Sequence, residues 1–135
     1  MNMRAVSLAA LGISLFASPA FAGPCPPTIS VDEKPPGSAA GAIPVEHKFR
    51  YVSFFEGDPK DQADLAPDDG PNPKKLEQRW DLTRMPGQTI TMVCRYHGTD
   101  KTITQVVPPA ISSCTLKGEM DGHGEIIGSP VFECK

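Results

Sequence analysis

Four cysteines constrain the fold of this chain more than any other feature of its sequence. Cys25, Cys94, Cys114 and Cys134 are separated by 69, 20 and 20 residues, and no two of them form a C-x-x-C pair. Structural zinc sites and thioredoxin-type redox sites both place two thiols on one tight turn, so the spacing favours neither. An even number of cysteines in a short exported chain instead indicates a framework of disulfide bonds.

The first 22 residues have the layout of a cleavable secretory signal. Arg4 precedes an apolar run over residues 5–17, and Ala20-Phe21-Ala22 ends the segment. The apolar run is too short to be a membrane span, and Cys25 does not directly follow the expected cut as a lipid anchor requires. We therefore expect cleavage after Ala22, which leaves a single periplasmic or secreted domain of residues 23–135.

The charge balance argues against two classes of partner. Once Arg4 is removed with the signal, 12 Lys and Arg remain against 16 Asp and Glu. Nucleic acids and anionic membranes are bound by clustered basic side chains, and the sequence contains no basic stripe. We expect neither a nucleic acid partner nor a membrane anchor.

Alternation of apolar and polar residues marks a series of strands. The alternation runs over residues 45–57, 76–83, 88–98 and 102–108, with shorter candidates at 28–31, at 112–117 and around Val131 and Phe132. Turn residues separate these segments, and no window shows the 3.6-residue period of a helix. The pattern predicts an all-β fold, a small antiparallel meander that forms a sandwich or barrel.

The same alternation assigns side chains to faces of the strands. In residues 45–57 one face holds Val45, His47, Phe49, Tyr51, Ser53 and Phe55, and the other holds Glu46, Lys48, Arg50, Val52 and Phe54. In residues 88–98 one face holds Ile90, Met92, Cys94 and Tyr96. We interpret Trp80, Tyr96 and Met92 as core side chains, because each falls on an alternating apolar face.

The predicted strands suggest how the cysteines pair. A Cys94–Cys114 bridge would tie the predicted hairpin at 88–108 to the following strand, and a Cys25–Cys134 bridge would clamp the two ends of the domain. The chain-entropy model assigns these bridges about 3 and about 5 kcal/mol of stability. The two other connectivities stay open at this point.

The polar segment at residues 58–75 is rich in aspartate. It carries Asp58, Asp61, Asp64, Asp68 and Asp69. Their spacing is not that of an EF-hand, which also needs a glycine in the middle of the loop. We interpret the segment as a solvated loop in which Leu65 pins a short helical turn.

The sequence supports no catalytic or metal site. It lacks a G-x-S-x-G elbow, and its cysteines are expected to be oxidised. Asp121, His123 and Glu125 offer three metal ligands, but the glycines on both sides of His123 are more typical of a turn. We therefore assign no catalytic residue, no metal and no cofactor.

Several short stretches resemble a family of small uncharacterised exported proteins of proteobacteria. They are Cys25-Pro26, FFEGDPKDQADLAPDD, Trp80-Asp81-Leu82, VCRYHGT and a Val-Pro pair before Ser113-Cys114. The resemblance implies an exported, compact, disulfide-bearing domain of unknown function, and it transfers no catalytic residue.

The sequence favours a non-enzymatic binding or inhibitor module that acts on another macromolecule. The expected partner is a basic protein, such as a cell-wall-degrading enzyme or a toxin. Charged side chains on the loops of a rigid β-frame are the candidate contacts, namely Asp61, Asp64, Asp68, Asp69, Arg95, His97 and Lys101. The alternative is a small periplasmic hydrolase or metal-binding protein.

Overall fold

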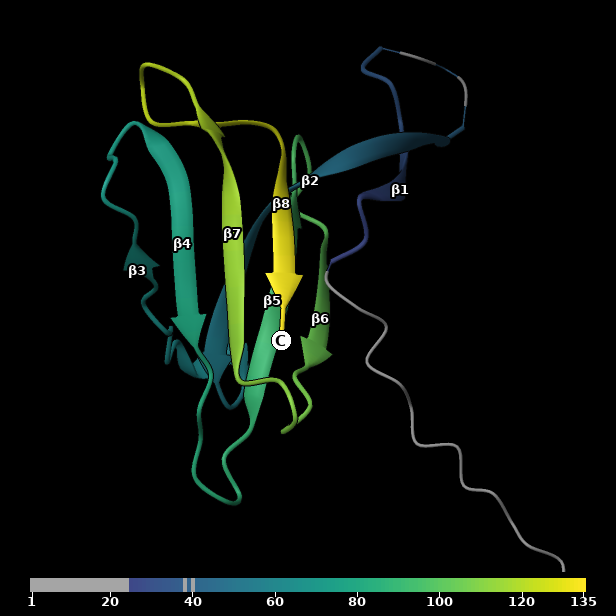
Figure 1. Ribbon diagram of the computed structural model, residues 1–135. Coiled ribbons are helices and arrows are strands. Elements are labelled where there is room, and N and C mark those ends of the chain that lie inside the picture. Colours follow the sequence, from purple (N-terminus) through teal and green to yellow (C-terminus); the bar gives the residue numbers. More distant parts are fainter. Residues whose placement is uncertain (1–24, 38, 40) are drawn as a thin grey trace, which may run out of the picture.

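The computed structural model describes residues 25–37, 39 and 41–135. The predicted signal at residues 1–22 lies outside this range. The described elements are β1 (Thr28–Glu33), β2 (Ile43–Glu56), the 3-10 helix η1 (Pro59–Asp61), β3 (Asp68–Asp69), β4 (Lys75–Asp81), β5 (Ile90–Tyr96), β6 (Thr102–Val106), β7 (Ser113–Met120) and β8 (Ile126–Cys134). Figure 1 shows their arrangement. Among these residues no helix has the length and apolar character that a bilayer span needs.

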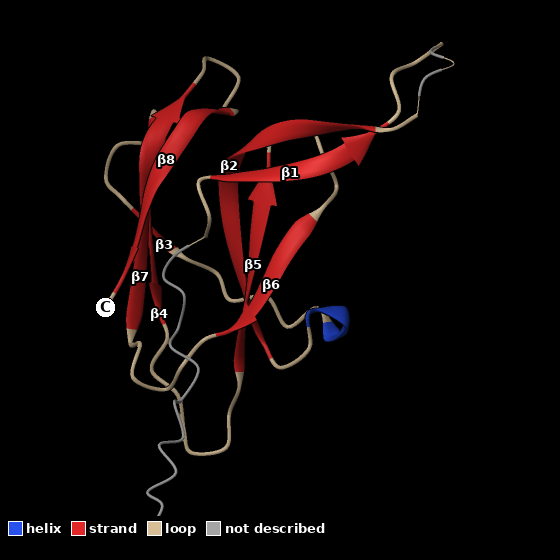
Figure 2. Cartoon of the chain, turned by 90° about the vertical axis from the view of Figure 1, so that its right-hand side faces the viewer, coloured by secondary structure: helices blue, strands red, loops and turns tan. Residues whose placement is uncertain are grey.

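The strands form two antiparallel sheets that lie against each other as two layers (Figure 2). Their orders are β1-β2-β5-β6 and β3-β4-β7-β8. The prediction of an all-β antiparallel fold is confirmed. The order differs from that of one continuous meander. The chain forms four hairpins, β1–β2, β3–β4, β5–β6 and β7–β8, and successive hairpins alternate between the two sheets.

The core lies between the sheets and is rich in aromatic side chains. The rings of Phe54 and Trp80 are 5.1 Å apart, and that of Phe132 is 6.2 Å from Phe54. Trp80, Tyr96 and Met92 are at most 2% exposed, which confirms their interpretation as core residues. Pairs of rings at these separations contribute about 0.5–1.5 kcal/mol beyond the area that they bury.

Strand β2 contains a β-bulge, and the predicted faces of this strand are wrong beyond it. Phe49 lies opposite Tyr96 in β5, but the next β5 residue, Arg95, lies opposite Tyr51. Arg50 is therefore an extra residue in β2. The buried side chains are at odd-numbered positions before it, His47 and Phe49, and at even-numbered positions after it, Val52 and Phe54. The assignment of Val52 and Phe54 to the face opposite that of Phe49 was wrong, because an inserted residue reverses the alternation beyond it.

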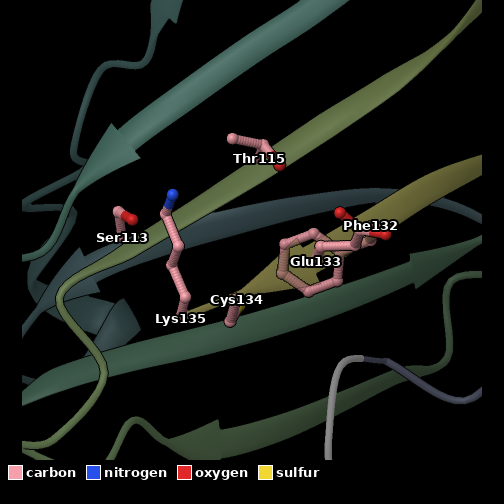
Figure 3. A pocket seen from close by; sticks show the side chains of 6 residues that line it. All are labelled: Ser113, Thr115, Phe132, Glu133, Cys134 and Lys135. Atoms are coloured by element: carbon pink, nitrogen blue, oxygen red, sulfur yellow. The ribbon is translucent and has the colours of Figure 1, made fainter.

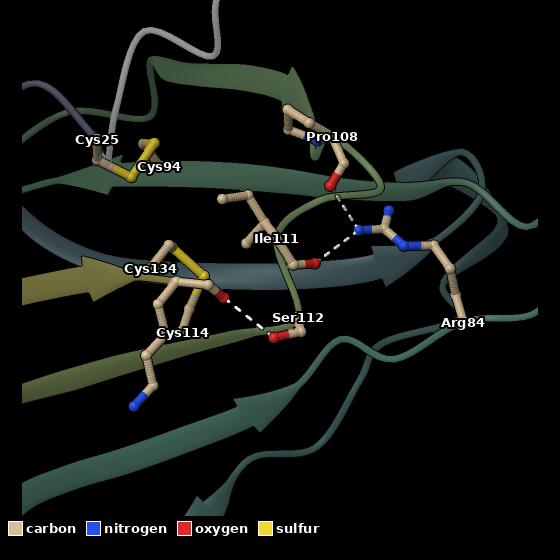
Figure 4. The surroundings of a disulfide bond; sticks show 9 residues. Cys25, Arg84, Cys94, Pro108, Ile111, Ser112, Cys114 and Cys134 are labelled. Atoms are coloured by element: carbon tan, nitrogen blue, oxygen red, sulfur yellow. Dashed lines mark hydrogen bonds between the residues drawn. A yellow bond between two sulfur atoms is a disulfide. The ribbon is translucent and has the colours of Figure 1, made fainter.

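All four cysteines are in disulfides, but the predicted pairing was wrong (Figure 4). The bonds are Cys25–Cys94 and Cys114–Cys134. Cys94 lies in β5 and Cys114 in β7, which belong to different sheets. Cys114 instead lies directly opposite Cys134 in the β7–β8 pair. The segment before β1 reaches β5, since the Tyr96 hydroxyl donates a hydrogen bond to the Pro26 carbonyl at 2.9 Å.

Candidate interaction surface

Residues 58–69, which we call the acidic segment, connect the two sheets along one side of the sandwich. The segment starts after β2, where Asp58 accepts a hydrogen bond from the Lys60 amide and caps η1. Asp64 then forms a β-bridge with Phe55, on the edge of β2 that faces away from β5. The segment ends as β3, which pairs with β4 of the other sheet.

Core side chains hold the acidic segment in place. Trp80 donates its indole N–H to the Leu65 carbonyl at 3.1 Å, and the Leu65 amide donates to the Phe54 carbonyl at 2.8 Å. Leu65 packs against the core, whereas the helical turn that was assigned to it lies earlier, at Pro59–Asp61. Because its middle is anchored to both sheets, the segment presents its carboxylates from a defined backbone.

A hydrogen-bonded chain continues from β2 to the end of the segment. The Tyr51 hydroxyl donates to the Gln78 side-chain oxygen at 2.8 Å, and the Gln78 amide donates to an Asp69 carboxylate oxygen at 3.0 Å. Burial raises the pKa of the Tyr51 phenol above its ordinary 10.0, and the charges of Asp64 and then Asp69 raise it further, whereas the Gln78 hydrogen bond and Arg95 act in the opposite sense. Three of the predicted contact residues, Asp64, Asp69 and Arg95, thus act on one half-buried phenol.

The structure separates the seven predicted contact residues into two groups. Asp61, Asp64, Asp68 and Asp69 are exposed on the acidic segment. Arg95 lies in β5 and donates to the Ser53 hydroxyl at 3.2 Å, near enough to Tyr51 to lower its pKa. His97 and Lys101 lie in the turn between β5 and β6, at the end of β5 that is far from η1.

The carboxylates of the acidic segment have no cationic neighbour within ion-pair distance in the part of the chain that the structure describes. The salt bridges there are His47–Glu33, Arg50–Glu125 and Lys117–Glu77. Asp61, Asp64 and Asp68 are exposed and form no ion pair with any described residue.

Sequence reasoning missed a partly buried polar cluster around His47. The His47 Nδ1 lies 2.7 Å from the His97 carbonyl oxygen, and its Nε2 lies 2.6 Å from a Glu33 carboxylate oxygen. Since both partners are acceptors, either the imidazole carries two protons or Glu33 carries one. The His97 ring in turn donates to the Gly128 carbonyl at 2.9 Å, so that turn is tied to β8. No local pattern marks this cluster, because its members come from four separate segments.

Arg84 was missed as well. Its guanidinium donates to the carbonyls of Val107, Pro108 and Ile111 at 2.8–3.0 Å. Figure 4 shows the bonds to Pro108 and Ile111. These bonds join the loop after β4 to the loop after β6. The role of Arg84 is structural, since every partner is a backbone oxygen of a neighbouring loop.

The described surface contains several hollows. One of about 390 Å3 lies at the ends of β7 and β8 and is lined by Ser113, Thr115, Phe132, Glu133, Cys134 and Lys135 (Figure 3). These six residues include no histidine to activate a hydroxyl, and the Cys134 thiol is in a disulfide. The turn at 121–125 is closed by Asp121, which accepts from the amides of His123 and Glu125. Within the described ranges no three metal-ligating side chains are grouped.

The family model described as type VI secretion system Tli immunity protein matches residues 43–135. An uncharacterised 16.3 kDa protein in the trpG 5' region of Azospirillum brasilense is 29% identical over 140 residues, which cover 95% of this chain and 93% of that protein. No solved structure matches the chain.

The relative and the family match confirm the resemblance to a family of small proteobacterial proteins. The family match spans all of the described strands except β1 and includes the acidic segment. The chain therefore belongs to the Tli immunity protein family of the type VI secretion system, whose members are inhibitor-type modules that act on a partner toxin.

Proposed function

We propose that this protein binds and neutralises a toxin delivered by a type VI secretion system, and that it does so after export to the periplasm. The family match over residues 43–135 carries this proposal. The two disulfides support the location, because such bonds persist in an oxidising compartment. The signal-like segment at residues 1–22 supports it too.

The acidic segment is the first contact surface of the proposed complex. Its exposed carboxylates have no partner among the described cations, and its backbone is held by the Trp80 hydrogen bond to Leu65 and by the pairing of β3 with β4. A surface that is ordered before binding loses little conformational entropy in the complex. Negative charge on it speeds the encounter with a basic surface of the toxin.

A rescue assay tests the function. Each type VI effector of the source bacterium is exported to the periplasm of a susceptible host, with and without this protein. The expected result is that growth is restored against one effector, and that the same protein lacking residues 1–22 gives no rescue. If every toxic effector kills equally in the presence of the exported protein, the proposal is wrong.

A charge variant tests the acidic segment. Replacing Asp61, Asp64, Asp68 and Asp69 by Asn is expected to slow association with the rescued effector about tenfold at low salt, since electrostatic steering changes association rates by about 10–10³-fold. The difference shrinks at high salt because ions screen exposed charges. Surface plasmon resonance at several ionic strengths measures both effects.

The control has the same net charge but neutralises acidic side chains elsewhere. It combines Asp32→Asn, Glu46→Gln, Asp100→Asn and Glu133→Gln, all at exposed positions. If the two quadruple variants associate at the same rate, net charge and not the acidic segment guides the encounter. Equal thermal midpoints of both variants and the parent protein exclude a folding defect.

A further inference from the structure

Strand β6 forms one border of its sheet (Figure 2), and among the described strands it pairs only with β5. Just beyond its end, the Val107 amide donates to the Ile90 carbonyl at 2.8 Å, so the Val107 N–H points toward β5. In an antiparallel ladder this direction alternates residue by residue. With the β5–β6 register, this places the N–H and C=O groups of Thr102, Thr104 and Val106 on the side away from β5, and outside the strand ladders the described residues form no backbone hydrogen bond to them.

The other three sheet borders carry features that prevent strand pairing. Strand β3 is two residues long and both are aspartates. Strand β1 ends in Asp32 and Glu33. Strand β8 has an irregular register with β7, and it contains a proline, Pro130. Short length, charge, bulges and proline are the usual protections of an exposed edge.

Strand β6 has none of these protections. Its sequence, TITQV, contains no charge and no proline, and it keeps a regular register with β5 over all five residues. The outward side chains are Thr102, Thr104 and Val106, and Val106 is 64% exposed. An uncharged edge strand with a regular register and free peptide groups is a template for another strand.

The outer face beside β6 is also almost free of charge. The register places Phe55, Thr91 and Val106 in one row, and Ser53, Val93 and Thr104 in the next. Arg95, opposite Thr102, is the ionised side chain of this part of the face. A strand added to β6 would thus meet apolar and hydroxyl side chains over most of its length, with an acidic side chain favoured near Arg95.

We propose that β6 is a strand-addition site that receives an extended segment of the toxin, whose side chains over Val106 and Thr104 are uncharged. This inference rests on the proposed function. Backbone hydrogen bonds to Thr102, Thr104 and Val106 supply affinity, and alternate side chains against the outer face supply specificity. The partner is an extended protein segment whose charge, if any, is an acidic group opposite Arg95.

Amide exchange measured residue by residue tests the geometry and the contact together. In the free protein the amides of Thr102, Thr104 and Val106 are expected to exchange quickly, while those of Ile103 and Gln105, which point toward β5, exchange slowly. Adding the effector identified by rescue is expected to slow the three outward amides at least tenfold. Unchanged exchange at these amides in a saturated complex refutes the proposal.

A substitution that removes one outward N–H tests the contribution to affinity. Thr104→Pro deletes a donor that the β5–β6 ladder does not use, and proline is tolerated on an edge strand where its nitrogen faces solvent. We expect the dissociation constant to rise at least tenfold, whereas Thr104→Val, which keeps the N–H, stays within about threefold. Val106→Lys, at an exposed position, is the second variant if the proline variant unfolds, and it is also expected to weaken binding tenfold.

The outcomes separate this inference from the proposed function. If the parent protein rescues growth but the folded proline and lysine variants bind as tightly as it does, the strand-addition site is wrong and the function stands. If the parent protein rescues against no effector, both are wrong. A concentration-dependent dimer that Thr104→Pro abolishes, seen by sedimentation without the effector, overturns the proposal in favour of a second copy of this chain on β6.

Discussion

Removing the two disulfides one at a time gives a quantitative test of the fold. Cys25–Cys94 closes a loop of 69 residues and Cys114–Cys134 a loop of 20. In the chain-entropy model the free energy lost from the unfolded state grows with the logarithm of the loop length. The model gives about 4.4 kcal/mol for the longer loop and about 3.3 kcal/mol for the shorter one.

The perturbation is a pair of double variants, Cys25→Ala with Cys94→Ala, and Cys114→Ala with Cys134→Ala. Each removes two sulfur atoms from largely buried positions, so the packing losses are similar and the expected difference of about 1 kcal/mol reports the loop length. A domain of this size has about 5–15 kcal/mol of stability, so the first variant is expected to be marginal at 37 °C.

Urea unfolding, followed by the fluorescence of Trp80, measures both free energies. Trp80 is the single tryptophan and is buried between the sheets, so its signal reports the loss of the core. Peptide mapping of the parent protein without reductant checks the pairing directly. A Cys94–Cys114 peptide, or a larger loss for the Cys114–Cys134 variant than for the other, would refute the reasoning.

Two further predictions concern a glycine and the tyrosines. Gly118→Ala is expected to destabilise the fold by about 1–3 kcal/mol, because its Cβ would lie 2.9 Å from the rigid ring of Pro130. In the control, Gly122→Ala, the Cβ meets no atom within 4 Å. Chemical unfolding of both variants measures the difference, and equal stabilities would contradict the packing argument. Burial raises the pKa values of Tyr51 and Tyr96, the two tyrosines of the chain. The stability that their protonated phenols contribute is therefore complete below pH 10 and is lost as the pH rises through the folded-state pKa values. During alkaline titration the absorbance at 295 nm is expected to rise at higher pH in the native protein than in urea, and coincident curves would exclude the shift.

The parts of the fold that sequence could predict were those governed by local pattern. Alternation placed β4 and β5 and identified Trp80, Met92 and Tyr96 as core, because side chains of a regular strand point alternately to the two faces. The same reasoning failed beyond Phe49. A bulge at Arg50 reverses the alternation, and no residue type marks that position in the sequence.

The disulfide pairing failed for a different reason. It depends on which strands are neighbours, and that order is decided by how the hairpins are distributed between the sheets. A bond between Cys94 and Cys114 is plausible in one continuous meander, but here a change of sheet separates them. The same limit hid the contacts of His47 and Arg84, whose partners are distant in the sequence. The acidic segment was recognisable by composition, whereas its attachment to Trp80 required the three-dimensional structure.

The two proposed contact surfaces lie on opposite borders of one three-stranded region. The acidic segment bridges to β2, β6 is the far border, and β5 lies between them. Neighbouring strands are about 4.8 Å apart and three such spacings separate the acidic segment from β6, so the two surfaces are about 14 Å apart. A standard interface buries about 800 Å2 on each partner, and one toxin surface is therefore large enough to contact both.

The two surfaces should nevertheless affect different rate constants. Exposed charge acts mainly on association, whereas a backbone ladder formed in the bound state acts mainly on dissociation. We therefore expect the Asp→Asn variant to change the association rate, Thr104→Pro to change the dissociation rate, and the combined variant to show the sum of both free energies within about 0.5 kcal/mol. A combined loss clearly smaller than that sum would mean that the acidic segment and β6 hold the same part of the toxin, and the two surfaces would then be one site.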